Sequence, residues 1–397
     1  AGRRAAPGRE RRARFSHRSI MRKILVLGGG LVGGAIAREL ARDPEIAVTV
    51  ADSLPETLDR VSARAPIATV KADLASGVEI GRLASEADAV VGALPGRLGF
   101  GMLEAVLSAG KPIADISFSS EDPLRLDGLA KSRGATAVVD CGVSPGISNF
   151  AMGRAAAELD EISDAAIFVG GLPFDRDRPG EYAIVFSAID LIEEYTRPAR
   201  LVVNGKIVTR PALSEVETVD VPGVGRLEAF LTDGLRTLLT TIPARNMREK
   251  TLRYPGHAGS MRVLRDAGFF AEQPIEVDGG SVVPRALAER LLFKTWQLHP
   301  GEEEFTFLRV DVRGRRAGRE TRRVFELFDR TDPVTGLTSM ARTTGFPCAV
   351  VAGMLARGEY RDPGVRPLEF LARQPAAADR FGYLLRQRGI VWTEKVE

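Results

Sequence analysis

The sequence predicts an α/β protein with a Rossmann-type, doubly wound parallel sheet and a second, mixed α+β substrate domain. An apolar strand starting near Arg22 runs into the glycine turn Gly28-Gly-Gly-Leu-Val-Gly33 and then into an amphipathic helix, which is typical of a dinucleotide-binding start. Apolar and helical stretches alternate regularly as far as Asp140, and this alternation stops afterwards. The change of pattern predicts two domains.

The glycine turn has a specific physical role at each position. Gly28 allows a tight turn, Gly30 lets the backbone approach a pyrophosphate, and Gly33 lets the helix pack closely on the strand. The N–H groups at the helix start, around Leu31 and Val32, would face the anion. We expect Gly28→Ala or Gly30→Ala to block cofactor binding with little unfolding.

A carboxylate follows the second predicted strand, which spans Ile46 to Ala51. Asp52 lies 24 residues after Gly28, where it can accept hydrogen bonds from both ribose hydroxyls. It would repel a 2′-phosphate, and the next residues (Ser53, Leu54, Pro55) provide no cation to neutralise one. The sequence therefore predicts NAD rather than NADP as the cofactor.

The remaining strands and helices of the first domain follow the same alternation. Further strands are predicted at 67–70, 89–93, 112–116 and 135–139, giving six parallel strands, with helices near 56–64, 78–86, 100–109 and 123–132. Ligands bind outside the carboxyl ends of such strands. The residues predicted at those ends are Asp73, Ala93, Leu94, Pro95, Asp115, Ser117, Asp140, Cys141 and Gly142.

The second domain contains hairpin signals. Asn204-Gly205 between two apolar runs predicts a two-residue hairpin, and strands at 305–312 and 322–329 flank an Arg-rich turn at 313–319. A helix is predicted over 348–357, with Gly345 and Pro347 marking its start. The predicted division is 21–145 with 338–370 for cofactor binding, 146–337 for substrate binding and dimerisation, and 371–397 as a C-terminal segment.

Composition narrows the class of protein. With 44% hydrophobic and 27% charged residues the chain suits a globular fold, and no apolar run is long enough to span a membrane. Two cysteines and three histidines provide neither a disulfide framework nor a metal site, and they fit a reducing, cytoplasmic location. Residues 1–20 hold seven Arg and one Glu, and the rest has 48 basic and 51 acidic residues, which argues against nucleic-acid binding.

The basic leader over 1–20 has two readings. It resembles a transit peptide in being Arg-rich and acid-poor. It can equally be translated sequence upstream of a true start at Met21. The second interpretation is favoured because a predicted strand begins two residues after Met21.

Several motifs follow one another in a fixed order along the chain. These motifs are Gly28–Gly33, Asp140–Gly146, Glu181-Tyr182, Phe186-Ser187, Glu194–Ala199, Leu227–Phe230, Thr232–Thr237, Lys250–His257 and Met340–Thr344. Together they resemble the saccharopine dehydrogenase family, most closely its lysine 6-dehydrogenase-like branch. The resemblance implies a Rossmann domain joined to a substrate domain, usually in a homodimer. It also implies oxidation or reductive formation of a carbon–nitrogen bond of an amino acid with NAD or NADP.

Amine oxidation requires a base that removes a proton from the nitrogen before hydride leaves the carbon. His257, in the turn before a helix, is the first candidate, with Tyr182, Glu181 and Asp233 as others. Saccharopine-forming relatives carry Gly-Tyr or Gly-Phe where this chain has Gly256-His257.

An α-carboxylate on the substrate requires a fixed cation, for which Arg236, Arg253 and Arg342 are candidates within the family-like motifs. Cys141 is a candidate wall residue, although nothing in the sequence provides a base to make it a nucleophile.

We therefore expect an NAD-dependent oxidoreductase acting on the CH–NH₂ or CH–NH bond of a basic amino acid, with ε-deamination of L-lysine first. One alternative is a saccharopine-type or carboxyspermidine-type dehydrogenase, which joins an aldehyde to an amine. Another is a non-catalytic NAD-binding regulator.

Cofactor choice provides the first test. NAD should give a higher kcat/KM than NADP, and Asp52→Ser or Asp52→Ala should erode this preference because the repulsion of a 2′-phosphate is removed. Steady-state kinetics with both cofactors measures the ratio. A higher kcat/KM with NADP for the unmodified protein would contradict the expectation.

Overall fold

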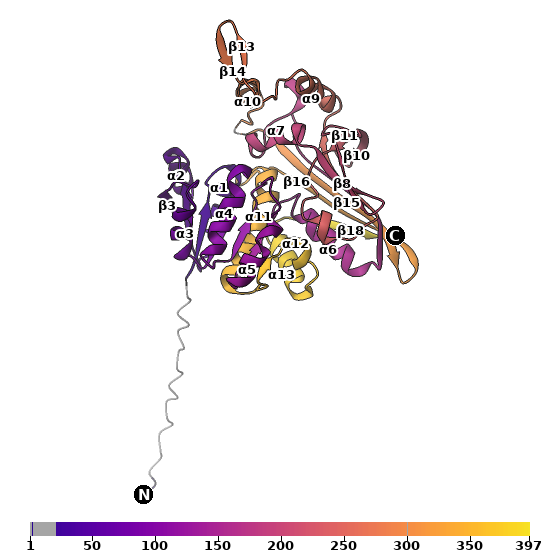
Figure 1. The fold of residues 1–397 in the computed structure, drawn as a ribbon. Helices are drawn as coiled ribbons and strands as arrows, with labels where there is room; N and C mark the ends of the chain where they lie inside the picture. Colours follow the sequence, from indigo (N-terminus) through magenta and orange to yellow (C-terminus); the bar gives the residue numbers. More distant parts are fainter. Residues whose placement is uncertain (1, 3–20, 300) are drawn as a thin grey trace.

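The computed structural model describes Gly2, residues 21–299 and residues 301–397. The predicted basic leader, apart from Gly2, lies outside the described residues. Two β-sheets lie side by side, each with its own helices (Figure 1). The predicted fold class, a parallel Rossmann-type sheet plus a mixed second sheet, is confirmed.

The first sheet is parallel throughout and has seven strands in the order β17-β6-β5-β4-β1-β2-β3. Its strands are β1 (Arg22–Leu27), β2 (Ile46–Asp52), β3 (Ala68–Lys71), β4 (Ala89–Gly92), β5 (Ile113–Asp115), β6 (Thr136–Val138) and β17 (Gly364–Val365). The six predicted strands are present. The seventh, β17, is two residues long and too short to leave a pattern in the sequence.

Helices cover both faces of this sheet because alternate side chains of each strand point in opposite directions. Ile24 and Val26 of β1 belong to the core that contains α1 and α11, whereas Leu25 and Leu27 belong to the core that contains α3 and α4. The helices of this part are α1 (Leu31–Leu40), α2 (Pro55–Ser62), α3 (Gly77–Ser85), α4 (Gly96–Ser108), η1 (Pro123–Leu126) and α5 (Asp127–Ser132).

The second sheet has nine strands, and all its pairings are antiparallel except β7 with β12. Its strands are β7 (Glu161–Pro173), β8 (Ala199–Val203), β9 (Lys206–Arg210), β10 (Glu217–Val221), β11 (Gly225–Leu231), β12 (Asn246–Arg253), β15 (Glu304–Arg316), β16 (Arg319–Arg330) and β18 (Trp392–Val396). The Asn204-Gly205 hairpin is confirmed. Both turn residues have positive φ, of 49° and 74°, as a two-residue hairpin requires.

The sequence predicted a turn over the Arg-rich run 313–319. This prediction is wrong, because most of the run is strand. β15 continues to Arg316 and β16 begins at Arg319, so Ala317 and Gly318 alone form the turn, both with positive φ. Cross-strand ion pairs such as Arg315 with Glu320 let basic residues remain in an extended hairpin.

Helix α11 (Ser339–Arg357) begins nine residues before the predicted start at Cys348. Pro347 lies within it instead of marking its start. A proline there removes a backbone hydrogen bond and crowds the carbonyl four residues earlier, and the burial of most of the helix offsets this cost. Thr338 caps the helix by accepting a hydrogen bond from the Ala341 N–H at 3.2 Å. Of its 19 residues 16 are buried, which explains the apolar sequence on all its sides.

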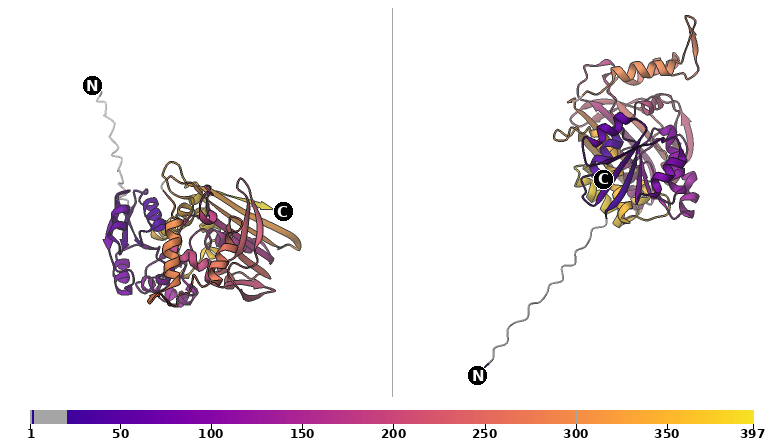
Figure 2. Two further views of the ribbon diagram at one scale, coloured as in Figure 1. Left: turned by 90° about the horizontal axis from the view of Figure 1, so that it is seen from above. Right: turned by 90° about the vertical axis from the view of Figure 1, so that its left-hand side faces the viewer.

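The remaining elements complete the core or project from it. They are α6 (Ile147–Glu158), η2 (Pro179–Glu181), α7 (Ala188–Thr196), α8 (Leu238–Thr241), α9 (His257–Asp266), β13 (Ile275–Val277), β14 (Gly280–Val282), α10 (Pro284–Thr295), α12 (Leu368–Leu371) and α13 (Pro375–Arg386). Helix α10 and the β13–β14 hairpin stand away from the body (Figure 2). In the described part of the chain, no helix is long and apolar enough to cross a membrane.

Candidate active site

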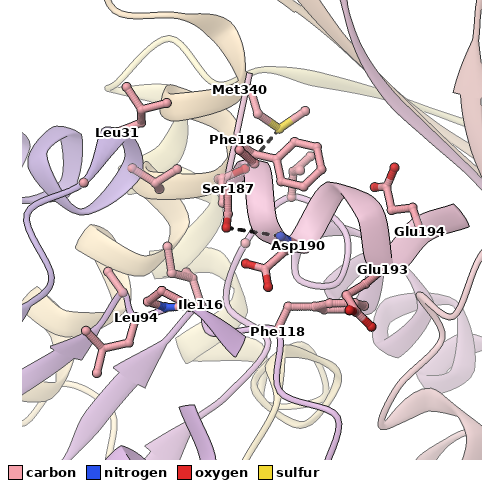
Figure 3. A pocket seen from close by; sticks show the side chains of 18 of the residues that line it. Leu31, Leu94, Ile116, Phe118, Phe186, Ser187, Asp190, Glu193, Glu194 and Met340 are labelled. Atoms are coloured by element: carbon pink, nitrogen blue, oxygen red, sulfur yellow. Dashed lines mark hydrogen bonds between the residues drawn. The ribbon is translucent and has the colours of Figure 1, made fainter. Parts of the chain in front are cut away.

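A cavity of about 640 Å³ lies between the two sheets and is lined by residues of both. We call the parallel sheet with its helices the first unit and the mixed sheet with its helices the second unit. Figure 3 shows Leu31, Leu94 and Ile116 of the first unit across from Phe186, Ser187 and Asp190 of the second unit. The first side includes the carboxyl ends of β1, β2 and β4, where a Rossmann sheet binds its ligand.

The glycine turn at one end of the cavity has the shape of a dinucleotide cradle. Gly28 has φ of +99°, and a Cβ there would lie 2.4 Å from the Ala93 carbonyl oxygen. A Cβ at Gly33 would lie 2.0 Å from the Gly28 carbonyl oxygen, whereas one at Gly30 would meet no heavy atom within 4 Å. Helix α1 starts directly after Gly30 without a side-chain cap. Its first N–H groups, with Leu31 and Val32 on the cavity wall, can therefore receive a pyrophosphate.

Asp52 lies beside this cradle at the end of β2. Its Oδ2 accepts a hydrogen bond from the Gly29 N–H at 2.8 Å, and its Oδ1 accepts one from the Leu54 N–H at 2.9 Å. The carboxylate thus lines the cavity at the position expected for the adenosine ribose. Arg60 on α2 donates to the Gly29 carbonyl at 3.3 Å, so a cation that the sequence analysis did not consider also lies near this edge.

The loops after β4 and β5 differ in how well the sequence predicted them. Ala93, Leu94 and Pro95 line the cavity, as expected. After β5 the residues that line the cavity are the neighbours of the predicted ones, because successive side chains of an extended chain point to opposite sides. Ile116 and Phe118 line the cavity, whereas Asp115 and Ser117 are buried away from it.

Two other predicted residues, Asp73 and Cys141, lie outside the cavity lining as Asp115 does. Asp115 accepts a hydrogen bond from the Ser117 N–H at 2.9 Å, and burial raises its pKa to about 7. Asp73 is exposed and accepts a hydrogen bond from the Ala75 N–H within its own turn. Cys141 is fully buried in the core beneath the cavity, and its neighbours Asp140 and Gly142 form the wall instead.

His257 belongs to a buried aromatic cluster outside the cavity lining. Its Nδ1 lies 3.0 Å from the Gly180 carbonyl, which can only accept, so Nδ1 carries the proton and Nε2 accepts from the Tyr195 hydroxyl at 2.9 Å. Burial and the nearby Arg253 lower the pKa of His257 to about 3. A ring with both nitrogens occupied and so low a pKa does not fit the general base expected from the sequence.

Tyr182 and Glu181 also lie outside the cavity lining. The Tyr182 ring packs under the Arg253 guanidinium at 4.5 Å, and burial raises the pKa of its hydroxyl. Glu181 pairs with Arg176 on the surface.

The predicted carboxylate-binding arginines already have acidic partners. Arg236 is buried, with its Nε 3.2 Å from Asp140, and Arg342 pairs with Asp329 at 3.4 Å outside the cavity. Arg253 does line the cavity, but it donates to Glu194 at 2.5 Å. Asp233 also lines the cavity, and Arg200 binds both of its carboxylate oxygens at 2.8 Å. None of these pairs leaves a bidentate arginine open for a substrate carboxylate.

The strand β12 carries a polar stripe that the sequence analysis missed. Glu249, Thr251 and Arg253 alternate along it and line the cavity together. Thr232 donates to Glu249 at 2.6 Å and the Gly234 N–H donates at 3.1 Å, and burial raises the pKa of Glu249 to about 8. The strand also has polar residues on its other face, Arg248 and Lys250, so no alternation in the sequence marked this stripe.

Acidic side chains outnumber basic ones on the cavity wall. Among the described residues that line it, seven carboxylates face three guanidinium groups. The carboxylates are those of Asp52, Asp140, Asp190, Glu193, Glu194, Asp233 and Glu249, and the guanidinium groups are those of Arg97, Arg197 and Arg253. Arg200, Arg236 and Arg285 lie outside the lining and pair with three of these carboxylates, so the negative excess is smaller than this count. The remaining excess favours a ligand that carries positive charge.

Alanine at two glycines should separate folding from cofactor binding. Gly30→Ala places its methyl group in open space where a pyrophosphate would lie, so we expect an unchanged Tm and a Kd for the dinucleotide raised by about tenfold or more. For Gly28→Ala the little unfolding expected from the sequence is wrong, because φ is left-handed and a Cβ would lie 2.4 Å from the Ala93 carbonyl oxygen. We expect this variant to destabilise the fold by about 1–3 kcal/mol or more. Thermal unfolding and calorimetric titration measure both. Equal destabilisation by the two variants would contradict this geometry.

His257→Asn should act on stability and not on turnover. Loss of the ring and its hydrogen bonds should cost about 1–3 kcal/mol at neutral pH, with kcat changed less than tenfold. Because the folded-state pKa is lowered from 6.5 to about 3, the stabilisation is present above pH 6.5 and is lost as the pH falls toward 3. The difference in urea unfolding free energy between wild type and variant should therefore shrink on acidification. A hundredfold loss of kcat with unchanged stability would restore His257 as the base.

Comparison with known proteins agrees with this architecture. The saccharopine dehydrogenase NADP binding domain matches residues 24–138, and the saccharopine dehydrogenase C-terminal domain matches residues 142–390. An apo saccharopine dehydrogenase (L-Glu forming) from Saccharomyces cerevisiae has the same fold, with a TM-score of 0.78 at 19% identity over 95% of this chain and 100% of that one.

Curated relatives have related names. The chain is 23% identical to a saccharopine dehydrogenase [NADP(+), L-glutamate-forming] of Pyricularia oryzae, over 94% of this chain and 99% of that protein. It is 26% identical to a carboxynorspermidine synthase of Vibrio cholerae, over 62% and 60%. It is 24% identical to the mitochondrial alpha-aminoadipic semialdehyde synthase of Bos taurus, covering 87% of this chain but only 45% of that protein.

Two matching family models in chain order span most of the sequence, and the fold agrees with them, so the family resemblance seen in the motifs is confirmed. The chain belongs to the saccharopine dehydrogenase family.

Proposed function

We propose that this chain is a nicotinamide-dependent oxidoreductase that acts on a carbon–nitrogen bond of a basic amino acid, with L-lysine as the first candidate and NAD as the cofactor. The observation that carries the proposal is the acidic cavity that runs from the glycine cradle to the Glu249 wall. A dinucleotide site and an amine site would thus share one space.

The acidic wall bears on which member of the substrate class is bound. L-lysine carries two ammonium groups and one carboxylate, so it matches a wall with seven carboxylates and three guanidinium groups. A saccharopine-like substrate adds a dicarboxylate arm and would need further free cations. Arg97 on the cavity rim has no ion-pair partner among the described residues, and it is our candidate for holding the single α-carboxylate.

The cofactor, when bound, would supply a hydride acceptor at the nicotinamide end of the cavity. The residues that would hold it are Gly30, Leu31 and Val32 at the pyrophosphate and Asp52 at the ribose. Asp52 supports NAD. Two observations favour NADP instead: the nearby cation of Arg60, and the description of the matching family model as NADP binding.

In the proposed reaction the carbon that carries the ε-amine loses a hydride and becomes an iminium carbon. Water then adds to this carbon and ammonia leaves, which gives the 6-semialdehyde. The semialdehyde cyclises to an imine by attack of its own α-amine. The protein's contribution is to orient the amine and to accept its proton.

A second candidate is reductive coupling of an aldehyde to an amine. It is favoured by the names of the relatives, which include saccharopine dehydrogenases and a carboxynorspermidine synthase. The same cavity would then hold both an amine and a carbonyl partner.

A substrate panel distinguishes these candidates. Purified protein is incubated with NAD or NADP and, separately, L-lysine, L-ornithine, a diamine, saccharopine and L-glutamate, and the absorbance of the reduced nicotinamide is followed. We expect the highest kcat/KM with L-lysine and NAD and little turnover of saccharopine, because the wall repels its extra carboxylates. Turnover of saccharopine alone would support the second candidate. Cofactor binding in calorimetry without turnover of any substrate would support a regulator.

A further inference from the structure

Glu249 differs from the other carboxylates that line the cavity. Four of those carboxylates have an arginine within ion-pair distance: Asp140 with Arg236, Glu193 with Arg285, Glu194 with Arg253, and Asp233 with Arg200. An ion pair favours the charged form, so these arginines oppose the rise that burial gives the pKa of Asp140 and Glu194. Glu249 has no such partner among the described residues.

Two further lining carboxylates also lack an arginine partner, but each has a different environment. Asp52 lies at the ribose end and accepts two backbone N–H groups. Burial raises the pKa of Asp190 as well, but Asp190 lies on α7 and accepts the N–H of Gly96 at 3.4 Å, at the start of α4. Glu249 is instead only 3% exposed and lies on the strand wall of the second sheet.

Two hydroxyl groups connect Glu249 to the cavity. The Thr232 hydroxyl donates to Glu249 Oε2 at 2.6 Å, and its oxygen lies 2.8 Å from the Thr251 hydroxyl, which donates to it. All three residues line the cavity. If the carboxyl is protonated, this chain can reverse direction, so a proton can move between Glu249 and Thr251 without a change in heavy-atom positions.

We propose that Glu249 is the catalytic base that accepts the proton of the substrate's reacting nitrogen, directly or through Thr232 and Thr251. This inference rests on the proposed function. In the oxidative direction the substrate ammonium gives one proton to the carboxylate and becomes a neutral amine. The C–H bond then breaks, its electron pair and hydrogen pass as hydride to the oxidised nicotinamide cofactor, and the nitrogen lone pair forms the C=N bond.

The charged groups around Glu249 are consistent with this role. Glu194 on α7 and Asp233 after β11 add negative charge, while Arg253 and Arg200 are each engaged with one of these two carboxylates. Burial and this negative charge raise the pKa of Glu249 to about 8, so the carboxyl can both take up and release a proton near neutral pH. An ammonium group bound beside it would favour the ionised form and expel the proton.

The test uses Glu249→Gln, which preserves the shape and an acceptor for Thr232. The matched control is Glu304→Gln, since Glu304 is also buried with a pKa raised to about 8 but lies outside the cavity lining. The glutamine amide oxygen still accepts the Met340 N–H that Glu304 accepts at 3.0 Å, so the start of α11 is preserved. We expect Glu249→Gln to lower kcat by about 10²–10⁴-fold and to remove the rise of kcat/KM toward pH 8. KM and the Kd of the cofactor should change little. Glu304→Gln should keep the wild-type pH profile.

A second readout does not depend on turnover. L-lysine is titrated at pH 7 into the enzyme saturated with reduced cofactor, in buffers of different ionisation enthalpy, so that calorimetry counts the protons released. Wild type and Glu304→Gln should release up to one proton per lysine bound, and Glu249→Gln should release none.

The possible outcomes separate the two proposals. If wild type oxidises L-lysine but Glu249→Gln retains both the pH profile and the proton release, Glu249 is not the base and the proposed function stands. Loss of the profile in Asp190→Asn alone would assign the role to Asp190. If wild type oxidises no amine, the proposed function fails and this inference fails with it.

Discussion

The structure depends on one buried helix that joins the two sheets. Helix α11 packs against α1, β1, β4 and β5 of the first unit and against β15 and α13 on its other side. Its residues belong to a single core that contains both Val26 of the first sheet and Val310 of the second. Because a close-packed interior resists displacement, this helix fixes how the two sheets face each other.

The same helix also shapes the cavity directly. Its first turn is held by the Glu304 carboxylate, which accepts the Met340 N–H at 3.0 Å, and Met340 and Thr344 then line the cavity. The opposing walls, with the glycine cradle on one side and the β12 stripe on the other, therefore belong to one rigidly packed unit. A cavity lined by both sheets can form only where the second sheet is held this close to the carboxyl ends of the first.

The sequence predicted best what depends on local chain geometry. The six strands, the glycine turn, Asp52 and the Asn204-Gly205 hairpin are short-range patterns with a direct physical reason. Asp115 and Ser117 were chosen in place of Ile116 and Phe118 because a strand end is predictable but the direction of each side chain at it is not. The start of α11 was predicted too late because a proline usually marks a helix boundary. In this helix the packing of the surrounding buried residues offsets the cost of Pro347.

The chemistry of the second unit was harder to predict because it depends on long-range burial and pairing. His257 has a suitable ordinary pKa, and only the fold shows both of its nitrogens occupied and its pKa lowered. The sequence does not show that Arg236 and Arg253 are ion-paired, because their partners Asp140 and Glu194 are distant in sequence and come beside them only in the fold. The pKa of Glu249 is raised by burial, and no local sequence pattern indicates that this side chain is buried.

The most direct measurement is a crystal structure of the protein with oxidised nicotinamide cofactor and an unreactive analogue of L-lysine. The account predicts the pyrophosphate at the N-terminus of α1, the adenosine ribose at Asp52, and the analogue's ε-nitrogen within hydrogen-bond distance of Glu249 or Thr251. A ligand nitrogen bound at His257, or a dinucleotide bound away from the glycine turn, would contradict it.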